Sequence, residues 1–454
     1  MTRPAAITDA GAAAPVSVAA GWTPTAFRVA VASILVAFVA LTSWNLAHTS
    51  WLRGYDAYHV VRYAEIVAFD HRLPRPDEVD VWHNPPLYFA AAGTAERVTK
   101  RFFGVDGSYR GAQLLSVASG LGVVLLAFLT ARDLFPESLT AQLGALGLAA
   151  ATPVLVRGSV MYHPEPLLAV LAALAIYLVV RSLARGPATV GAAALAGAVA
   201  GLASLTRTWG LAVIAALALV LALDAVRARR AWPVVAFSAA ALVLAGPWLA
   251  YKWAEHGSPL AFSTPGGAEQ WPGGGRDASF YTTVAAGELV RDPYAPHFRN
   301  RLLPVTYADW WGDWHRSFRV PEELRNLPER LPDEYRRPLV LQSLAGLVPT
   351  VLIFAGVVGL AVTAVRRRSL ALLAVLAPLA LLFVSYVFFL ARYPKADGDN
   401  IKALYLLNTV APLAVCGGWA LAQVRRAGTL AFAGVLLLLA AFLYSDLTFL
   451  VLPA

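Results

Sequence analysis

Residues 165–226 decide the fold class, and they read EPLLAVLAALAIYLVVRSLARGPATVGAAALAGAVAGLASLTRTWGLAVIAALALVLALDAV. Three apolar runs follow one another in this stretch, at 165–184, 187–206 and 208–226, with only short polar breaks between them. Each run is close to the about 20 apolar residues that a helix needs to cross the hydrocarbon core of a bilayer. The stretch therefore predicts consecutive membrane-spanning helices.

The same pattern continues in both directions along the chain. Eleven apolar runs have this approximate length: 26–47, 109–131, 138–156, 165–184, 187–206, 208–226, 232–253, 340–363, 369–391, 403–424 and 428–450. The 454 residues are 58% hydrophobic and 14% charged, whereas a soluble domain has about a quarter charged residues. This composition excludes a conventional water-soluble enzyme and predicts an all-α, polytopic membrane protein with about eleven transmembrane helices.

Clusters of arginine predict how the chain is oriented. If the N-terminus is cytoplasmic, every inner loop is basic, as membrane topology favours: these loops hold Arg132, Arg181, Arg185, Arg227, Arg229, Arg230, Arg366, Arg367, Arg368, Arg425 and Arg426. We therefore expect a multi-pass protein of the plasma (inner) membrane. The net charge of +9 then reflects topology, and no nucleic-acid partner is implied.

Four regions follow from this topology. We expect a cytoplasmic tail at 1–25, a transmembrane module at 26–253 that includes an outer loop at 48–108, a large outer-face loop at 254–339, and C-terminal transmembrane helices at 340–454. Within the first outer loop, helices are predicted at 56–70 and 86–103, and the second should lie on the membrane surface because its charges begin after only ten apolar residues. The glycine-rich stretch at 266–275 is at most a mobile lid.

Ionisable residues next to apolar spans are candidates for chemistry, because charges at such depths need partners. Asp56, Glu165 and Arg207 all fall on the outer side. Each also has a structural explanation: Asp56 as a helix N-cap, Glu165 as a carboxylate favoured by a helix dipole, and Arg207 as a side chain that snorkels to the interface. Together they favour transfer from a phosphate leaving group, since a carboxylate can deprotonate an acceptor hydroxyl and cations can stabilise a departing phosphate.

Several motifs occur in an order that resembles a known family. They are Asp56-x-x-His59, Leu73-Pro74, His83-Asn84-Pro85-Pro86-Leu87-Tyr88, Glu165-Pro166-Leu167-Leu168 and Gly201-Leu202-Ala203-Ser204-Leu205-Thr206-Arg207. Over about residues 25–260 this order resembles the GT-C integral-membrane glycosyltransferases, nearest to the protein O-mannosyltransferase and lipid A aminoarabinose transferase branch. The chain departs from the family at Ala57, where an acidic residue is common, and at Arg207 and Asn84, where lysine is usual.

The resemblance implies an enzyme that moves one sugar from a polyprenyl-phosphate donor to a hydroxyl of a glycan, lipid or protein acceptor at the outer face. By position, Asp56 would be the general base and Glu165 a second acid. Arg207 would contact the donor phosphate, assisted by His83 or Asn84, although both of these also suit a plain turn. A lipid-linked glycan flippase or another transporter is the alternative function, and a non-catalytic scaffold is a third.

The remaining candidates come from the other outer loops. Lys402 is expected to meet the donor phosphate or the acceptor, unless its loop only anchors at the interface. Trp310 and Asp313 are candidates for stacking on a sugar, although an aromatic belt explains the tryptophans as well. His59 and His163 are placed on the acceptor side. No cofactor is required; a divalent metal, which oligosaccharyltransferases of the superfamily use, would be held by Asp56, His59, His163 and Glu165.

Overall fold

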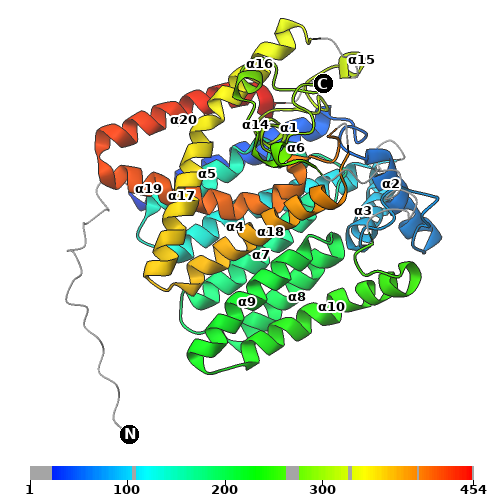
Figure 1. Ribbon diagram of the computed structural model, residues 1–454, viewed down its shortest axis with the longest axis horizontal. Coiled ribbons are helices and arrows are strands. Elements are labelled where there is room, and N and C mark those ends of the chain that lie inside the picture. The colour runs from blue at the N-terminus through cyan, green and yellow to red at the C-terminus, as the bar shows by residue number, and fades with distance from the viewer. Residues whose placement is uncertain (1–22, 105–108, 262–275, 326–329, 396–397, 452–454) are drawn as a thin grey trace.

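The computed structural model describes residues 23–104, 109–261, 276–325, 330–395 and 398–451 (Figure 1). Within these ranges the chain is helical and contains no strand, so the all-α prediction is confirmed. The elements are α1 Pro24–His48, α2 Ala57–Glu65, the π-helical η1 Ile66–Asp70, α3 Leu87–Phe103, α4 Arg110–Leu134, α5 Leu139–Ala150, α6 Pro153–Gly158, α7 Glu165–Leu183, α8 Val190–Thr206, α9 Gly210–Ala228, α10 Trp232–His256, α12 Ala278–Thr282, α13 Ala286–Leu289, α14 Leu302–Trp311, α15 Glu322–Arg325, α16 Asp333–Ala345, α17 Leu347–Arg366, α18 Leu370–Arg392, the 3-10 helix η2 Ala403–Thr409, α19 Val410–Ala427 and α20 Thr429–Leu450.

Every apolar run predicted to cross the membrane forms a helix. Among the described residues, nine helical segments are long and apolar enough to span a bilayer, and the two shorter apolar helices α5 and α8 account for the other two runs. The chain is therefore a multi-pass membrane protein, with a number of spans close to the predicted eleven.

Three predicted runs have a different shape in the structure. The run at 138–156 is divided, because Thr152 precedes Pro153 and takes an extended conformation, as residues before proline commonly do. The helix at the run 340–363 is longer than predicted. It begins at Asp333 with α16 and is interrupted at Gly346 before α17 starts. The run at 403–424 opens with the 3-10 helix η2 before α19 starts.

Small residues bring the spans into close contact. A Cβ added to Gly197 of α8 would overlap the backbone carbonyl of Phe237 in α10, and one added to Gly418 of α19 would overlap that of Ala141 in α5. Without a hydrophobic driving force between helices in lipid, this kind of close backbone packing supplies much of the association energy. The spans consequently form one tight bundle.

The two ends of the bundle differ in character (Figure 1). The turns that join α9 to α10, α17 to α18 and α19 to α20 lie together at the left of the view, whereas α2 and α3 lie at the right. The first group of turns carries the arginine clusters, and Arg227 donates to the backbone carbonyl of Arg368 across two of them at 2.7 Å. The arginine-rich turns therefore lie away from α2 and α3 in the fold.

Both helices predicted in the loop at 48–108 are present in the structure. Residues 56–70 give α2 and the turn η1, and residues 86–103 give α3, which does not qualify as a membrane span. Tyr63 of α2 stacks on Phe89 of α3 with ring centroids 3.7 Å apart, so these helices form a packed unit. The glycine-rich stretch at 266–275 lies outside the described residues.

Candidate active site

A cavity of about 220 Å³ opens at the end of the bundle where α2 and α3 lie. Asp56, His83, Asn84, Arg207 and Lys402 line it, and all five were singled out from the sequence. They come from the loops after α1, before α3, after α8 and before η2. Side chains far apart in the sequence thus share one site.

Asp56 presents a carboxylate at the edge of this cavity. It stands before the first residue of α2, but its side chain makes no capping hydrogen bond, so the N-cap explanation fails. Its Oδ2 lies 3.4 Å from Lys402 Nζ, and the side chain is 42% exposed. Burial raises the pKa of Asp56, but the positive charges of Lys402 and Arg207 outweigh this, and the pKa lies below its usual value. Asp56 is therefore ionised at neutral pH.

Arg207 is held in a fixed orientation by two partners. Its Nε donates to Glu165 Oε1 at 2.7 Å and its Nη1 donates to Asn84 Oδ1. The Arg207 side chain is only 12% exposed and that of Glu165 is fully buried, so Arg207 does not snorkel to the interface. The pair places a guanidinium fork in the cavity wall, and such a fork matches phosphate oxygens well.

Lys402 is the second cation in the cavity wall. Its Nζ lies 3.4 Å from Asp56 Oδ2 and 3.8 Å from Asp399 Oδ2, and 4.9 Å from the ring centroid of Tyr55. Burial lowers the pKa of Lys402, but Tyr405 and the charges of Asp56 and Asp399 raise it well above its usual range. The ammonium group therefore stays charged although the side chain is 4% exposed.

Polar atoms without partners also line the cavity or lie behind it. Among the described residues, Asn84 Nδ2 and Glu165 Oε2 are buried and have no hydrogen-bond partner. Buried polar atoms in folded proteins are usually hydrogen-bonded, so these two atoms are available to bind a ligand. Burial lowers the pKa of His83 to about 3, so its imidazole is neutral and offers the cavity a hydrogen bond rather than a charge.

Two predicted acceptor-side histidines do not line the cavity. The His59 ring Nε2 lies 3.3 Å from Asp80 Oδ2 at the protein surface. His163 is buried, and its Nδ1 accepts a hydrogen bond from the backbone N–H of Glu165 at 3.4 Å. His163 therefore supports the start of α7 and lies behind the site.

Trp310 and Asp313 are both buried in the protein interior. Trp310 is 8% exposed. Asp313 is fully buried, and its two oxygens accept three backbone N–H bonds, from Ser317, Phe318 and Arg319. The Asp313 carboxylate therefore closes a turn, and neither Trp310 nor Asp313 lines the cavity. The sequence could not separate a surface tryptophan cluster from a buried one.

The residues proposed to hold a divalent metal do not form a suitable donor set. In the described parts of the chain, no group of three or more His, Cys, Asp or Glu side chains is arranged to hold a metal. Asp56 faces Lys402 and Glu165 faces Arg207, so each carboxylate is already paired with a cation. Hard divalent cations need several oxygen ligands that converge, and this arrangement does not provide them.

A further residue, Asp309, holds two chain neighbours of the site in place, a role that the sequence did not assign to it. Asp309 of α14 is 1% exposed, and its Oδ1 accepts from Tyr55 Oη at 2.9 Å while its Oδ2 accepts from the backbone N–H of Ala403 at 2.7 Å. Tyr55 and Ala403 are the chain neighbours of Asp56 and Lys402. A lone acid in an apolar helix needs partners, and that signal could have marked Asp309 as a positioning residue.

Replacing Asp309 with asparagine is expected to slow catalysis without weakening donor binding. An amide cannot accept both bonds at once, because its NH₂ group would face either the Tyr55 hydroxyl or the Ala403 N–H. A displacement of about 1 Å between reacting groups can cost about a hundredfold in rate. We expect kcat to fall about ten- to hundredfold with an unchanged KM for the donor, and Tyr55→Phe to have a smaller effect. A higher KM at unchanged kcat would contradict this role.

A family model describes part of the chain. Residues 87–251 match the model for dolichyl-phosphate-mannose-protein mannosyltransferase. No curated protein matches the chain in sequence.

The fold itself is found among solved structures. The oligosaccharyltransferase of Archaeoglobus fulgidus, tethered to an acceptor peptide, is 15% identical over 92% of this chain and 54% of its own, with a TM-score of 0.51. Its apo form is 17% identical over 92% of this chain and 55% of its own, with a TM-score of 0.50. The chain has a GT-C fold.

The chain matches only part of each solved structure that it resembles. The chain spans about half the length of the oligosaccharyltransferase. ArnT from Cupriavidus metallidurans, bound to undecaprenyl phosphate, is 20% identical over 87% of this chain and 78% of its own, but with a TM-score of 0.41 that likeness is too weak to bear on the fold. The expected GT-C fold is therefore confirmed by the oligosaccharyltransferase structures, and the family model matches residues 87–251 within it.

Proposed function

We propose that this GT-C protein is a glycosyltransferase that moves a single sugar from a polyprenyl-phosphate donor to a hydroxyl of an acceptor. The observation that carries the proposal is one cavity in which the ionised carboxylate of Asp56 lies beside two cations, Arg207 and Lys402. Such a cavity suits a reaction that removes a proton from one group while a phosphate leaves another.

Each polar group of the cavity has one role in the proposed transfer reaction. Asp56 accepts the proton of the acceptor hydroxyl as the hydroxyl oxygen bonds to the anomeric carbon of the sugar. The bond from that carbon to the phosphate oxygen breaks, and the electron pair leaves with the polyprenyl phosphate. Arg207 and Lys402 stabilise the negative charge on the phosphate, with Asn84 Nδ2 as a further donor.

The size of the cavity and the family model both favour a donor with one sugar. A volume of about 220 Å³ is below the roughly 300–1,000 Å³ of pockets that hold drug-sized ligands, and it suits a phosphate with one sugar ring. The family model that matches residues 87–251 is named for a mannosyltransferase that uses dolichyl-phosphate-mannose. The acceptor class, whether glycan, lipid or protein, stays open.

In this proposal the site lies on the outer face of the plasma (inner) membrane. The arginine clusters occupy the turns at the end of the bundle opposite to the cavity, and loops rich in arginine remain on the cytoplasmic side. This arrangement supports a cytoplasmic N-terminus and transfer on the outer face.

Sugar transfer by the purified protein tests the proposal directly. The protein would be reconstituted in vesicles with radiolabelled polyprenyl-phosphate mannose, glucose or aminoarabinose, and transfer to a crude envelope acceptor fraction would be measured. Release of polyprenyl phosphate with label in the acceptor is expected for one donor. Movement of an intact lipid-linked glycan across the vesicle membrane without transfer would support the transporter alternative instead.

Protonation of Asp56 should not limit transfer between roughly pH 6 and 9. Asp56 has a lowered pKa, so its basic form is present throughout this range and is lost only as the pH falls through a value below the usual aspartate range. Lys402 has a raised pKa and stays protonated, and His83, with a pKa of about 3, stays neutral. A rate that falls below about pH 6.5 in the wild type and equally in Glu165→Gln would contradict Asp56 as the base.

A further inference from the structure

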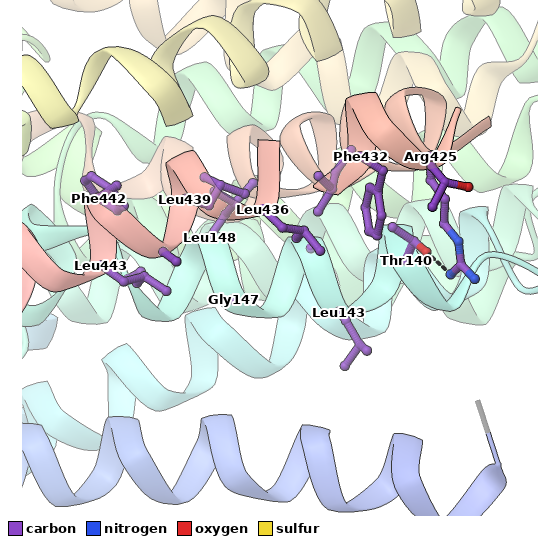
Figure 2. A pocket seen from close by; sticks show the side chains of 15 residues that line it. Thr140, Leu143, Gly147, Leu148, Arg425, Phe432, Leu436, Leu439, Phe442 and Leu443 are labelled. Atoms are coloured by element: carbon purple, nitrogen blue, oxygen red, sulfur yellow. Dashed lines mark hydrogen bonds between the residues drawn. The ribbon is translucent and has the colours of Figure 1, made fainter. Parts of the chain in front are cut away.

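A second cavity lies within the membrane-spanning part of the bundle, between α5, α19 and α20 (Figure 2). Its volume is about 640 Å³, and most of its wall is aliphatic or aromatic, with Leu143, Leu148, Leu436, Leu439 and Phe442 among the lining side chains. The candidate active site shares none of these residues. We call this second cavity the α20 groove.

The protein leaves the α20 groove open. Gly147 forms part of its wall, and a Cβ added there would meet no atom within 4 Å. An apolar cavity offers water no hydrogen-bond partners and stays dry. Because α5, α19 and α20 lie in the membrane region, the groove is surrounded by the hydrocarbon of the bilayer. A lipid acyl chain is therefore the molecule that can fill it and match its apolar lining.

One end of the α20 groove carries a positive charge. Arg425, in the last turn of α19, donates from Nη1 to Thr140 Oγ1 at 2.7 Å, and its Cζ lies 5.8 Å from the ring centroid of Phe432. Figure 2 shows Arg425 and Thr140 at the end opposite to Phe442 and Leu443. A guanidinium has five N–H donors, and no carboxylate in the described ranges pairs with Arg425. The remaining donors are available to an anion at the groove mouth.

The charged end of the α20 groove faces away from the candidate active site. Lys402 precedes η2 and Arg425 lies near the end of α19, so the two cations stand at opposite ends of one continuous helical segment. Arg425 therefore lies at the arginine-rich end of the bundle, and a long cationic side chain at the end of a span can reach lipid headgroups.

We propose that the α20 groove binds an anionic phospholipid of the arginine-rich leaflet, with one acyl chain in the groove and the phosphate on Arg425. This site is separate from sugar transfer and does not depend on the proposed function. Its occupant would fill the space between α5 and α20 and hold α20 against the bundle.

Native mass spectrometry of the whole protein, released from nanodiscs with equal phosphatidylglycerol and phosphatidylcholine, tests the proposal. The wild type is expected to retain one phosphatidylglycerol over phosphatidylcholine by about fivefold, the effect of one cation near an anionic lipid. Arg425→Gln should remove this preference. Arg426→Gln is the matched control, since it removes the same charge one residue along, from an exposed side chain outside the groove.

A second variant tests the groove itself. Gly147→Leu should fill the wall and lower retention of both lipids, whereas Gly191→Leu, also at a position where an added Cβ meets nothing within 4 Å but in α8, should leave retention unchanged. Gel filtration confirms that each variant is folded. Equal retention of the two lipids by the wild type, an equal loss in Arg425→Gln and Arg426→Gln, or full retention in Gly147→Leu would each overturn the proposal.

Discussion

Replacing Asp56 with asparagine is expected to lower sugar transfer by about 10²–10⁴-fold, the usual contribution of a positioned general base. The amide keeps the size of the side chain but cannot take the proton from the acceptor hydroxyl. Lys402 keeps Asp399 as a partner at 3.8 Å, so the site should remain folded. The measurement is the single-turnover rate of transfer, alongside the affinity for the polyprenyl-phosphate donor, which should change little.

Asp80→Asn is the matched control for Asp56→Asn. The Asp80 side chain is 85% exposed, pairs with His59 at 3.3 Å, and does not line the cavity, so its replacement should leave the rate within about twofold. Transfer by Asp56→Asn at the rate of the wild type would eliminate Asp56 as the base. The same result in both variants would mean that only the surface charge matters.

Replacing Arg207 with alanine is expected to have two large effects. Glu165 is fully buried and Arg207 is its only ion-pair partner among the described residues, so its loss should destabilise the fold by about 3–5 kcal/mol. Loss of a charge-assisted hydrogen bond to the donor phosphate should also weaken donor binding by roughly ten- to hundredfold. Thermal unfolding in detergent and donor binding measure the two effects separately.

A double variant separates the phosphate contact from the structural pair. Arg207→Met combined with Glu165→Gln removes both charges, so the stability should largely return while donor binding stays weak. Arg62→Ala is the control, because Arg62 pairs with Glu65 at 3.4 Å on an exposed surface and such pairs contribute about 0–1 kcal/mol. Undiminished donor binding by the double variant would remove Arg207 from the phosphate site.

Much of the candidate site could be predicted from the order of its residues in the chain. Asp56, His83, Asn84, Arg207 and Lys402 all lie in or beside loops on one predicted side, and all five line the cavity. Ionisable groups at the ends of spans must be brought to one membrane face by the topology, so the sequence restricts them to a common layer. That restriction does not say which of them meet.

The partnerships within this layer required the tertiary structure. Lys402 reaches Asp56 across 346 residues of sequence, and Asp309 reaches Tyr55 across 254. Trp310 and Asp313 lie close to Asp309 in sequence but point into packing. The direction of a side chain on a short outer helix depends on what that helix packs against, and no local pattern records this.

The sequence alone determined the membrane class, the approximate number of spans and the segregation of arginine, because hydropathy and loop charge act locally on each segment. Only the tertiary structure decided that Glu165 holds Arg207 and that Lys402 faces Asp56. The physical reason is that a buried charge is stabilised by whichever opposite charge the packing places beside it. That choice depends on the whole bundle.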